Sequence, residues 1–208
     1  VGMISHLGPQ LGIADGIGLS NKIDGITKAT LVISGDGGAS EGDFHEALNV
    51  AAVWGLPVIF LIESNHWGLS TPSKEQFNFE SFVTKGPAYG MEAVSCDGNN
   101  ILEVYHTVKT AADKIRKNPQ PILIECKTFR IRGHEEASGT KYYPEGVVAE
   151  WEKEDPLVNY ENWLIEKGII DAGYKEQHKL NFTLQVKKAV EAADALPPIS
   201  FDEENEVK

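Results

Sequence analysis

The chain has 208 residues, of which 41% are hydrophobic and 24% are charged, so it can bury a sizeable core and is not wholly disordered. Its 19 Lys and Arg stand against 31 Asp and Glu, and this net charge of −12 argues against nucleic acid or an anionic membrane as the main partner. No apolar run reaches the roughly 18 residues of a membrane-spanning helix. We therefore expect neither a nucleic-acid nor a membrane partner.

Cysteine use and the first residues bear on the compartment. Cys96 and Cys126 both lie in apolar stretches typical of buried strands, so we expect reduced core thiols rather than a disulfide. The start of the chain lacks the basic and apolar regions of a signal peptide. An intracellular protein is expected. Because the first residue is not Met, we also expect the chain to be part of a longer protein.

Helix and strand patterns alternate from the start of the chain. Small and apolar residues predict a closely packed helix over residues 6–22, and the apolar run 29–34 predicts a buried strand. Ser40, with Asp43 three positions later, predicts the N-terminal cap of the next helix. Gly55 is expected to end that helix.

Three more buried strands and another helix follow. The strands are predicted at residues 57–62, near 91–96 and at 121–126, and the helix at 101–117. Strands that are apolar throughout and are separated by helices are typical of a parallel sheet covered on both faces. The sequence therefore predicts an α/β fold with a doubly wound, mostly parallel sheet.

The character of the chain changes after these strands. Residues 130–150 are polar and contain several glycines, a loop long enough to be functional. Helices are predicted at residues 159–167 and 171–195, and the acidic tail at 202–206 is expected to be solvated. The predicted organisation has two parts, an α/β domain that includes the active-site loop and a C-terminal helical extension with the tail, at residues 1–150 and 151–208.

Polar residues follow two of the predicted strands, where ligands of parallel sheets gather. Asp36 follows the strand that ends near residue 34, and Asn65 follows the strand that ends near residue 62. If these strands are neighbours, a carboxylate and an amide oxygen meet there, and such ligands suit Mg²⁺ or Ca²⁺. Gly37 and Gly38 would let backbone N–H groups approach a phosphate at the start of the following helix. The sequence thus predicts a site for a metal ion and a diphosphate.

The same residues have a plainer interpretation, because a lone Gly-Asp-Gly is most often a turn and Asn65 is a common turn residue. Other motifs are excluded. The phosphate-binding P-loop string does not occur, and Ser40 stands where the dinucleotide fingerprint needs its third glycine. His45-Glu46 begins like a zinc-protease helix, but Asn49 stands where the second His is needed.

Two separated segments carry a resemblance to a known family. Residues 35–49, which begin with Gly-Asp-Gly, and residues 63–71, which contain Asn65, resemble the thiamine-diphosphate motif. The flanking sequence resembles the alpha subunit of the decarboxylating component of the 2-oxo acid dehydrogenases, of the pyruvate and branched-chain types. Residues 128–134 resemble that family's substrate-side loop, and the helices after Asp155-Pro156 resemble its C-terminal helical segment. The resemblance covers nearly the whole chain and implies a thiamine-diphosphate-binding fold.

The resemblance also implies how the metal and the diphosphate are held. Asp36, the Asn65 side chain and the backbone carbonyl of Trp67 would ligate Mg²⁺. The family usually has Tyr at the last position, a change that a carbonyl ligand tolerates. Gly37 and Gly38 would donate their amides to the diphosphate.

Three further cofactor and catalytic residues follow from the resemblance. Leu7 matches the apolar residue that supports the bent thiamine, His134 the loop histidine that contacts the diphosphate and the substrate, and Arg130 the basic residue just before it. Without the resemblance, Leu7 would be read as a core residue and Arg130 as a surface charge. Two departures stand out. Glu63 replaces a phosphate-contacting Arg of some relatives, and Glu135 replaces a phosphorylatable Ser of branched-chain relatives.

The activity that the resemblance implies is oxidative decarboxylation of a 2-oxo acid, with transfer of the acyl unit to a lipoyl group. A branched-chain substrate is slightly favoured over pyruvate. The implied partners are a lipoyl acyltransferase and a pyrimidine-binding beta subunit or fused beta-like domain, which supplies an activating Glu. The implied location is the cytoplasm for a bacterial protein and the mitochondrial matrix for a eukaryotic one.

Other functions remain open at the level of the sequence. The alpha subunit of an acetoin-type dehydrogenase would have the same cofactor site. A transketolase-like transferase is disfavoured because the loops at the strand ends offer few basic residues for a sugar phosphate. A binding or assembly module that has lost catalysis is a third alternative, which the retained Asp36, Asn65 and His134 argue against.

Overall fold

The computed structural model describes residues 6–137 and 139–198, so the predicted acidic tail at 202–206 lies outside the described residues. The chain divides into two compact units, Val1–Tyr160 and Glu161–Lys208. The domain boundary predicted at residue 150 stays a prediction. The first unit contains α1 (Pro9–Ile23), β1 (Thr30–Gly35), α2 (Gly42–Trp54), β2 (Val58–Ser64), β3 (Trp67–Gly68), β4 (Thr71–Pro72), α3 (Lys85–Ala88), β5 (Glu92–Asp97), α4 (Ile101–Lys117), β6 (Ile122–Lys127) and α5 (Val147–Trp151).

The unit boundary falls within α6 (Pro156–Glu166), and the second unit contains α7 (Tyr174–Asp194). Both helices were expected from the sequence. The first begins earlier than predicted because the Asp155 carboxylate accepts hydrogen bonds from the backbone N–H groups of Leu157 and Val158, at 2.8 and 3.3 Å. Within the second unit, Lys175 Nζ lies 2.7 Å from the Glu161 carboxylate.

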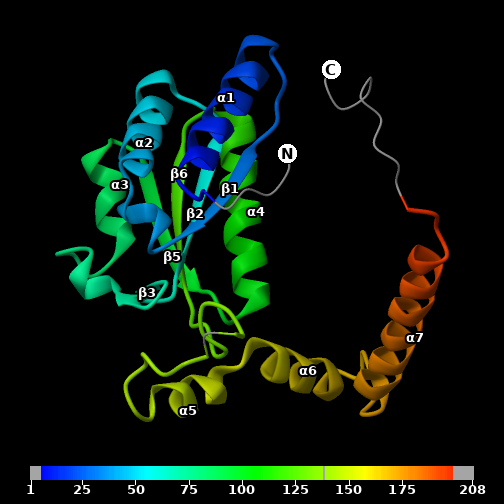
Figure 1. The fold of residues 1–208 in the computed structure, drawn as a ribbon. Helices are drawn as coiled ribbons and strands as arrows, with labels where there is room; N and C mark the ends of the chain where they lie inside the picture. The colour runs from blue at the N-terminus through cyan, green and yellow to red at the C-terminus, as the bar shows by residue number, and fades with distance from the viewer. Residues whose placement is uncertain (1–5, 138, 199–208) are drawn as a thin grey trace. The chain divides into compact units, whose positions relative to one another are not determined.

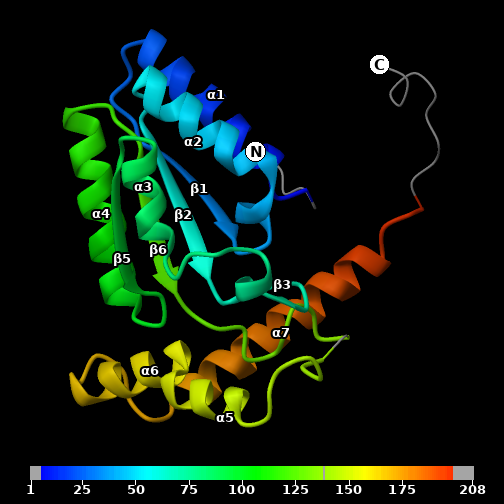
Figure 2. The ribbon, with the colours of Figure 1, turned by 90° about the vertical axis from the view of Figure 1, so that its left-hand side faces the viewer.

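The main sheet has four strands in the order β1-β2-β6-β5, and every neighbouring pair is parallel. A second, two-stranded antiparallel sheet is formed by β3 and β4. Figure 2 shows the strands of the main sheet running side by side toward the same edge. This confirms the predicted α/β class and the parallel sheet. The register pairs Gly35 of β1 with Glu63 of β2, so the ends of these two strands are adjacent.

Helices lie on both faces of the main sheet, with α1 and α2 on one face and α4 on the other (Figures 1 and 2). Because side chains alternate along a strand, Phe60 and Ile62 belong to the cluster under α1 and α2, whereas Ile59 and Leu61 belong to the cluster under α4. The predicted coverage is incomplete at β1. Its residues Leu31 and Ile33 are 45% and 47% exposed, since α4 does not extend over this edge strand among the described residues.

Local sequence explains some of the helix ends. The Asn100 side chain accepts hydrogen bonds from the N–H groups of Leu102 and Glu103, so α4 begins at Ile101 as predicted. Gly55 ends α2 with a φ of +57°, a left-handed conformation that suits glycine.

The predicted cap at Ser40 is wrong. The Ser40 hydroxyl donates to the Gly37 carbonyl at 2.6 Å and closes a short 3₁₀ turn, Gly38–Ser40, so α2 starts at Gly42 after Glu41. The predicted loop 130–150 also needs a correction at its end. Residues Val147–Trp151 form α5, whose Trp151 ring stacks on Phe129 with centroids 5.4 Å apart. This aromatic contact ties the end of the loop back to the end of β6.

Cys96 and Cys126 are free thiols in the core, as predicted. They face each other on β5 and β6 with their sulfur atoms 3.4 Å apart. Burial raises the pKa of both thiols. Among the described residues, no helix is both long and apolar enough to cross a membrane.

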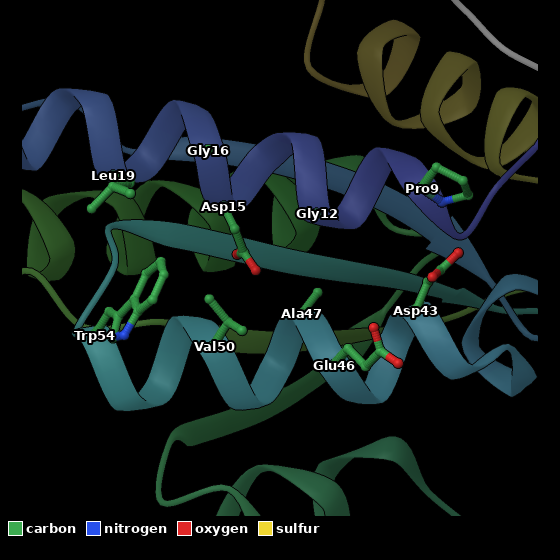
Figure 3. Close-up of a pocket in the computed structure, with 10 residues that line it drawn as sticks. All are labelled: Pro9, Gly12, Asp15, Gly16, Leu19, Asp43, Glu46, Ala47, Val50 and Trp54. Carbon is green, nitrogen blue, oxygen red and sulfur yellow. The ribbon is translucent and has the colours of Figure 1, made fainter.

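Asp15 is an exception to the apolar core of the first unit. It lies on the buried side of α1 with 5% of its surface exposed. Burial raises the pKa of its carboxyl group from 3.8 to about 7. The charged residues beside it in the space between α1 and α2 are Asp43 and Glu46 (Figure 3).

Replacing Asp15 by asparagine is expected to remove a pH dependence of stability. The folded chain holds the Asp15 proton up to about pH 7, whereas the unfolded chain loses it near pH 3.8. The free energy of unfolding of the wild type therefore falls as the pH rises between these values and levels off above them. The advantage of Asp15→Asn should grow by about 2 kcal/mol between pH 4 and pH 8. Urea unfolding of both proteins measures this, and parallel pH curves would contradict it.

Candidate functional site

Asp36 and Asn65 meet at the carboxyl edge of the main sheet. Each directly follows its strand, Asp36 after β1 and Asn65 after β2, and both are buried. The Asn65 backbone N–H donates to Asp36 Oδ2 at 2.7 Å. The structure thus brings together the two residues that the sequence placed at neighbouring strand ends.

A third residue, Ser73, fixes the other oxygen of this carboxylate. The Ser73 hydroxyl donates to Asp36 Oδ1 at 2.5 Å. Ser73 itself is held where β4 ends, because its backbone N–H donates to the His66 carbonyl at 2.8 Å. Both carboxylate oxygens of Asp36 therefore accept one hydrogen bond, and the orientation of the group is set. Sequence reasoning missed Ser73, since nothing local distinguishes it from any serine in a turn.

The chain from Asn65 to Leu69 makes a tight turn. The Trp67 N–H donates to Asn65 Oδ1 at 3.1 Å. His66 and Leu69 have φ angles of +67° and +54°, which non-glycine residues rarely adopt. Such conformations cluster at functional sites, where the surrounding structure holds them in place. Here they hold the Asn65 side chain and the Trp67 backbone within one turn.

Gly37 and Gly38 are needed for close packing rather than for their backbone angles. A Cβ atom on Gly38 would lie 3.0 Å from Leu7 Cβ and closer still to the Ser34 hydroxyl. A Cβ atom on Gly37 would lie 3.3 Å from Gly68 Cα. The turn after β1 therefore touches both Leu7, which precedes the N-cap of α1, and the Asn65–Leu69 turn. Leu7 is exposed beside this turn, so it is not the core residue that the plainer interpretation suggested.

Arg130 connects the loop after β6 to the Asn65–Leu69 turn. Its Nη2 donates to the Leu69 carbonyl at 2.8 Å and to the Trp67 carbonyl at 3.3 Å. Its Nη1 lies 2.8 Å from His134 Nδ1. A guanidinium can only donate, so Nδ1 of His134 accepts and the proton of the neutral ring is on Nε2. The two predicted residues Arg130 and His134 are therefore in direct contact. Arg130 also contacts the Trp67 carbonyl, which is the predicted metal ligand.

Two tyrosines that the sequence did not single out hold this loop. The Tyr142 hydroxyl accepts from the His134 N–H at 2.8 Å, and the Tyr143 hydroxyl donates to the Arg130 carbonyl at 2.9 Å. Their rings pack on Trp67, with centroids 5.5 and 5.0 Å away. Burial, followed by the neighbouring Tyr142, raises the pKa of Tyr143, so this phenol keeps the proton that it donates.

The oxygen atoms at this site suit a hard cation. A carboxylate offers about four lone pairs and an amide or backbone carbonyl two. The hydrogen bonds to Asp36, to Asn65 Oδ1 and to the Trp67 carbonyl leave lone pairs on all of them. No group of three or more His, Cys, Asp or Glu side chains within residues 6–137 and 139–198 could hold a metal ion. Of the predicted Mg²⁺ ligands, only Asp36 is a side chain of these four types. The predicted ligand set stays a prediction.

Glu63, which replaces a phosphate-contacting Arg of some relatives, has its side chain exposed on β2. Its backbone carbonyl accepts a hydrogen bond from Asn65 Nδ2 at 3.4 Å.

Replacing Arg130 by methionine is expected to loosen the loop that carries His134. The change removes the hydrogen bonds to Trp67, Leu69 and His134, each of which contributes roughly 1 kcal/mol. Cleavage by chymotrypsin after Tyr142 should become about 10-fold faster or more. Arg132→Met is the matched control. Arg132 lies in the same loop, but its ion pair with Glu136, at 3.5 Å, is exposed to solvent. Equal cleavage of the two variants would refute the bracing role.

Comparisons with known proteins place the chain in a family. A family model described as "Dehydrogenase E1 component" matches residues 1–200. The mitochondrial 2-oxoisovalerate dehydrogenase subunit alpha 1 of Arabidopsis thaliana is 36% identical over 193 residues, 91% of this chain and 41% of that protein. Its subunit alpha 2 is 41% identical over 162 residues, 76% of this chain and 34% of that protein.

A bacterial relative matches nearly the same share of this chain. The pyruvate dehydrogenase E1 component subunit alpha of Rickettsia felis is 32% identical over 196 residues, 92% of this chain and 59% of that protein. The chain thus spans only part of each curated relative, from 34% to 59% of its length.

Proposed function

This chain belongs to the dehydrogenase E1 component family, and we propose that it forms the diphosphate- and magnesium-binding part of a thiamine-diphosphate-dependent 2-oxo acid dehydrogenase. The observation that carries the proposal is the hydrogen bond of 2.7 Å that joins Asn65 to Asp36 at the ends of two adjacent parallel strands. The whole enzyme would decarboxylate a 2-oxo acid and pass the acyl unit to a lipoyl group. A branched-chain 2-oxo acid is slightly favoured over pyruvate, since the 2-oxoisovalerate relatives are 36% and 41% identical, whereas pyruvate relatives range from 29% to 36%.

The residues at the strand ends would hold the metal and the cofactor. Asp36, the Asn65 side chain and the Trp67 carbonyl would ligate Mg²⁺, which prefers such oxygen donors. The close-packed turn at Gly37 and Gly38 would present backbone N–H groups to the diphosphate. Exposed Leu7, which lies against Gly38, would support the thiamine. When bound, thiamine diphosphate supplies the electron sink that a decarboxylation needs and that no side chain provides.

Arg130 and His134 would act on the substrate side. The Arg130 guanidinium, held by the Trp67 and Leu69 carbonyls, places a fixed positive charge beside the proposed metal ligands. It also accounts for the tautomer of His134, whose Nε2–H is the donor that the ring can offer to a substrate oxygen. A donor fixed before substrate arrives stabilises charge that develops on such an oxygen.

The proposed partners are a second α/β half and a lipoyl acyltransferase. The second half, a beta subunit or a fused beta-like domain, would supply the Glu that activates the cofactor. The support is that residues 6–137 and 139–198 contain one parallel sheet and that the relatives named above are alpha subunits. The proposed location is the bacterial cytoplasm or the mitochondrial matrix, in line with relatives from a bacterium and from plant mitochondria.

Measurement of CO₂ release tests the proposed function. The 208-residue chain with Mg²⁺ and thiamine diphosphate is expected to release no more CO₂ from 3-methyl-2-oxobutanoate than the free cofactor does. Addition of the second half of the same protein should restore release, and pyruvate should be the poorer substrate. Release by the chain alone would contradict the need for a second half. Absence of release from either substrate by the assembled protein would contradict the proposed activity.

A further inference from the structure

The loop after β6 places the hydroxyl of Tyr142 on the backbone of His134. The His134 N–H donates to this hydroxyl at 2.8 Å, across eight positions of the chain. His134 is exposed, so water could satisfy the same N–H if the loop took another course. The contact therefore selects one position of the His134 backbone and does not merely satisfy a buried donor.

Gly133, the residue before His134, lets the backbone come this close. Its φ of +83° lies in the left-handed region that favours glycine. A Cβ atom on Gly133 would collide with the Gly139 carbonyl and would lie 3.0 Å from the Tyr142 hydroxyl. The chain just before His134 thus packs on the returning strand of the loop with no space left for a side chain.

The ring of Tyr142 is itself anchored. Its centroid lies 5.5 Å from that of Trp67 and 4.5 Å from that of Tyr143. The Tyr143 hydroxyl serves a different point of the loop, since it donates to the Arg130 carbonyl at 2.9 Å. The backbone of His134 is therefore tied through Tyr142 to Trp67, whose carbonyl is a proposed metal ligand.

His134 is consequently held at two points. Arg130 Nη1 lies 2.8 Å from ring atom Nδ1, and Tyr142 accepts from the backbone N–H. A contact at Nδ1 alone would let the ring move whenever the loop backbone moves. Two fixed points set the direction of the Nε2–H, and a displacement of about 1 Å in a catalytic group can lower a rate about 100-fold.

We propose that Tyr142 is a positioning residue for the decarboxylation, which holds the His134 backbone so that the Nε2–H is directed at the substrate oxygen. Tyr142 acts through His134 and is not itself a catalytic residue. The inference rests on the proposed function, in which His134 acts on the substrate side, and it adds a residue that the resemblance to the family did not supply.

Tyr142→Phe separates this role from simple filling of space. Phenylalanine keeps the ring that packs on Trp67 but removes the oxygen that accepts from His134. If Tyr142 only filled space, the phenylalanine variant would behave like the wild type. Tyr105→Phe is the matched control, because Tyr105 is 65% exposed on α4.

Hydrogen exchange followed by mass spectrometry tests the positioning without any turnover. It is measured on the native protein that carries this chain, with neither cofactor nor substrate added. In Tyr142→Phe, amide exchange in the peptide that contains His134 should become about 5- to 10-fold faster, since the N–H loses its acceptor. Tyr105→Phe should exchange like the wild type. Equal exchange in the two variants would overturn the proposal.

Kinetics of CO₂ release from 3-methyl-2-oxobutanoate by the same protein test the consequence for the reaction. Tyr142→Phe should lower kcat about 10-fold, while KM and the affinity for thiamine diphosphate stay within about twofold. A kcat equal to that of Tyr105→Phe would overturn the proposal. A loss of cofactor affinity as large as the loss in kcat would overturn it too, because it would indicate a general loosening of the site. Absence of release by the wild type would instead contradict the proposed function, and the inference would fall with it.

Discussion

Replacing Asp36 by alanine is expected to weaken the binding of thiamine diphosphate in the presence of Mg²⁺ by about 100-fold or more. Loss of groups that merely orient metal ligands lowers metal affinity 10- to 100-fold, so removal of the one carboxylate in the proposed set should have at least this effect. Asp36 is also the acceptor for the Asn65 N–H and for the Ser73 hydroxyl, so the change releases both. Titration with the cofactor, followed by quenching of tryptophan fluorescence, measures the affinity.

Two further variants make this test specific. Ser73→Ala keeps the carboxylate but removes the hydrogen bond to Oδ1, so binding should weaken by a smaller factor, about 10-fold. Asp24→Ala, at the exposed end of α1, should bind like the wild type. If Asp36→Ala binds the cofactor as tightly as Asp24→Ala, the metal assignment is wrong.

Replacing Glu125 by alanine is expected to lower the free energy of unfolding by about 3 kcal/mol. Glu125 lies on β6 with 1% of its surface exposed. Its carboxylate accepts from the Ser81 hydroxyl at 2.5 Å and from the Phe82 N–H at 3.3 Å, and so fixes the turn that begins at Ser81. The alanine variant leaves these two donors without their acceptor and leaves a cavity in the core. Urea unfolding, monitored by circular dichroism, measures the loss.

A matched pair of variants separates this role from a general effect of charge. Glu125→Gln keeps an acceptor and most of the volume, so its loss should be smaller than that of alanine. Glu92→Ala removes an exposed glutamate of the neighbouring strand β5, whose ion pair with Lys114 is open to solvent, and should change stability by less than about 1 kcal/mol. A loss from Glu125→Ala no greater than that from Glu92→Ala would show that the buried contacts contribute little.

The sequence by itself determined the four strands of the main sheet, the helices α1, α2 and α4, and the place of the strand-end residues. The helix predicted at residues 101–117 has these bounds, because its cap at Asn100 and its apolar period are local properties. The strands could be located because each is an apolar run between turn residues. Once the strands were parallel neighbours, Asp36 and Asn65 had to lie close together, since both directly follow their strands.

Other features were decided only by the tertiary structure, because they depend on residues that are distant in the chain. Ser73 reaches Asp36 across 37 positions and Glu125 meets Ser81 across 44, and no local pattern encodes either contact. The predicted helix cap at Ser40 was wrong because its hydroxyl donates to the Gly37 carbonyl, three residues earlier, instead of capping α2. The buried carboxylate of Asp15 was hidden in a helix of small residues. It became visible only when α2 packed beside α1 and left it without a partner among the described residues.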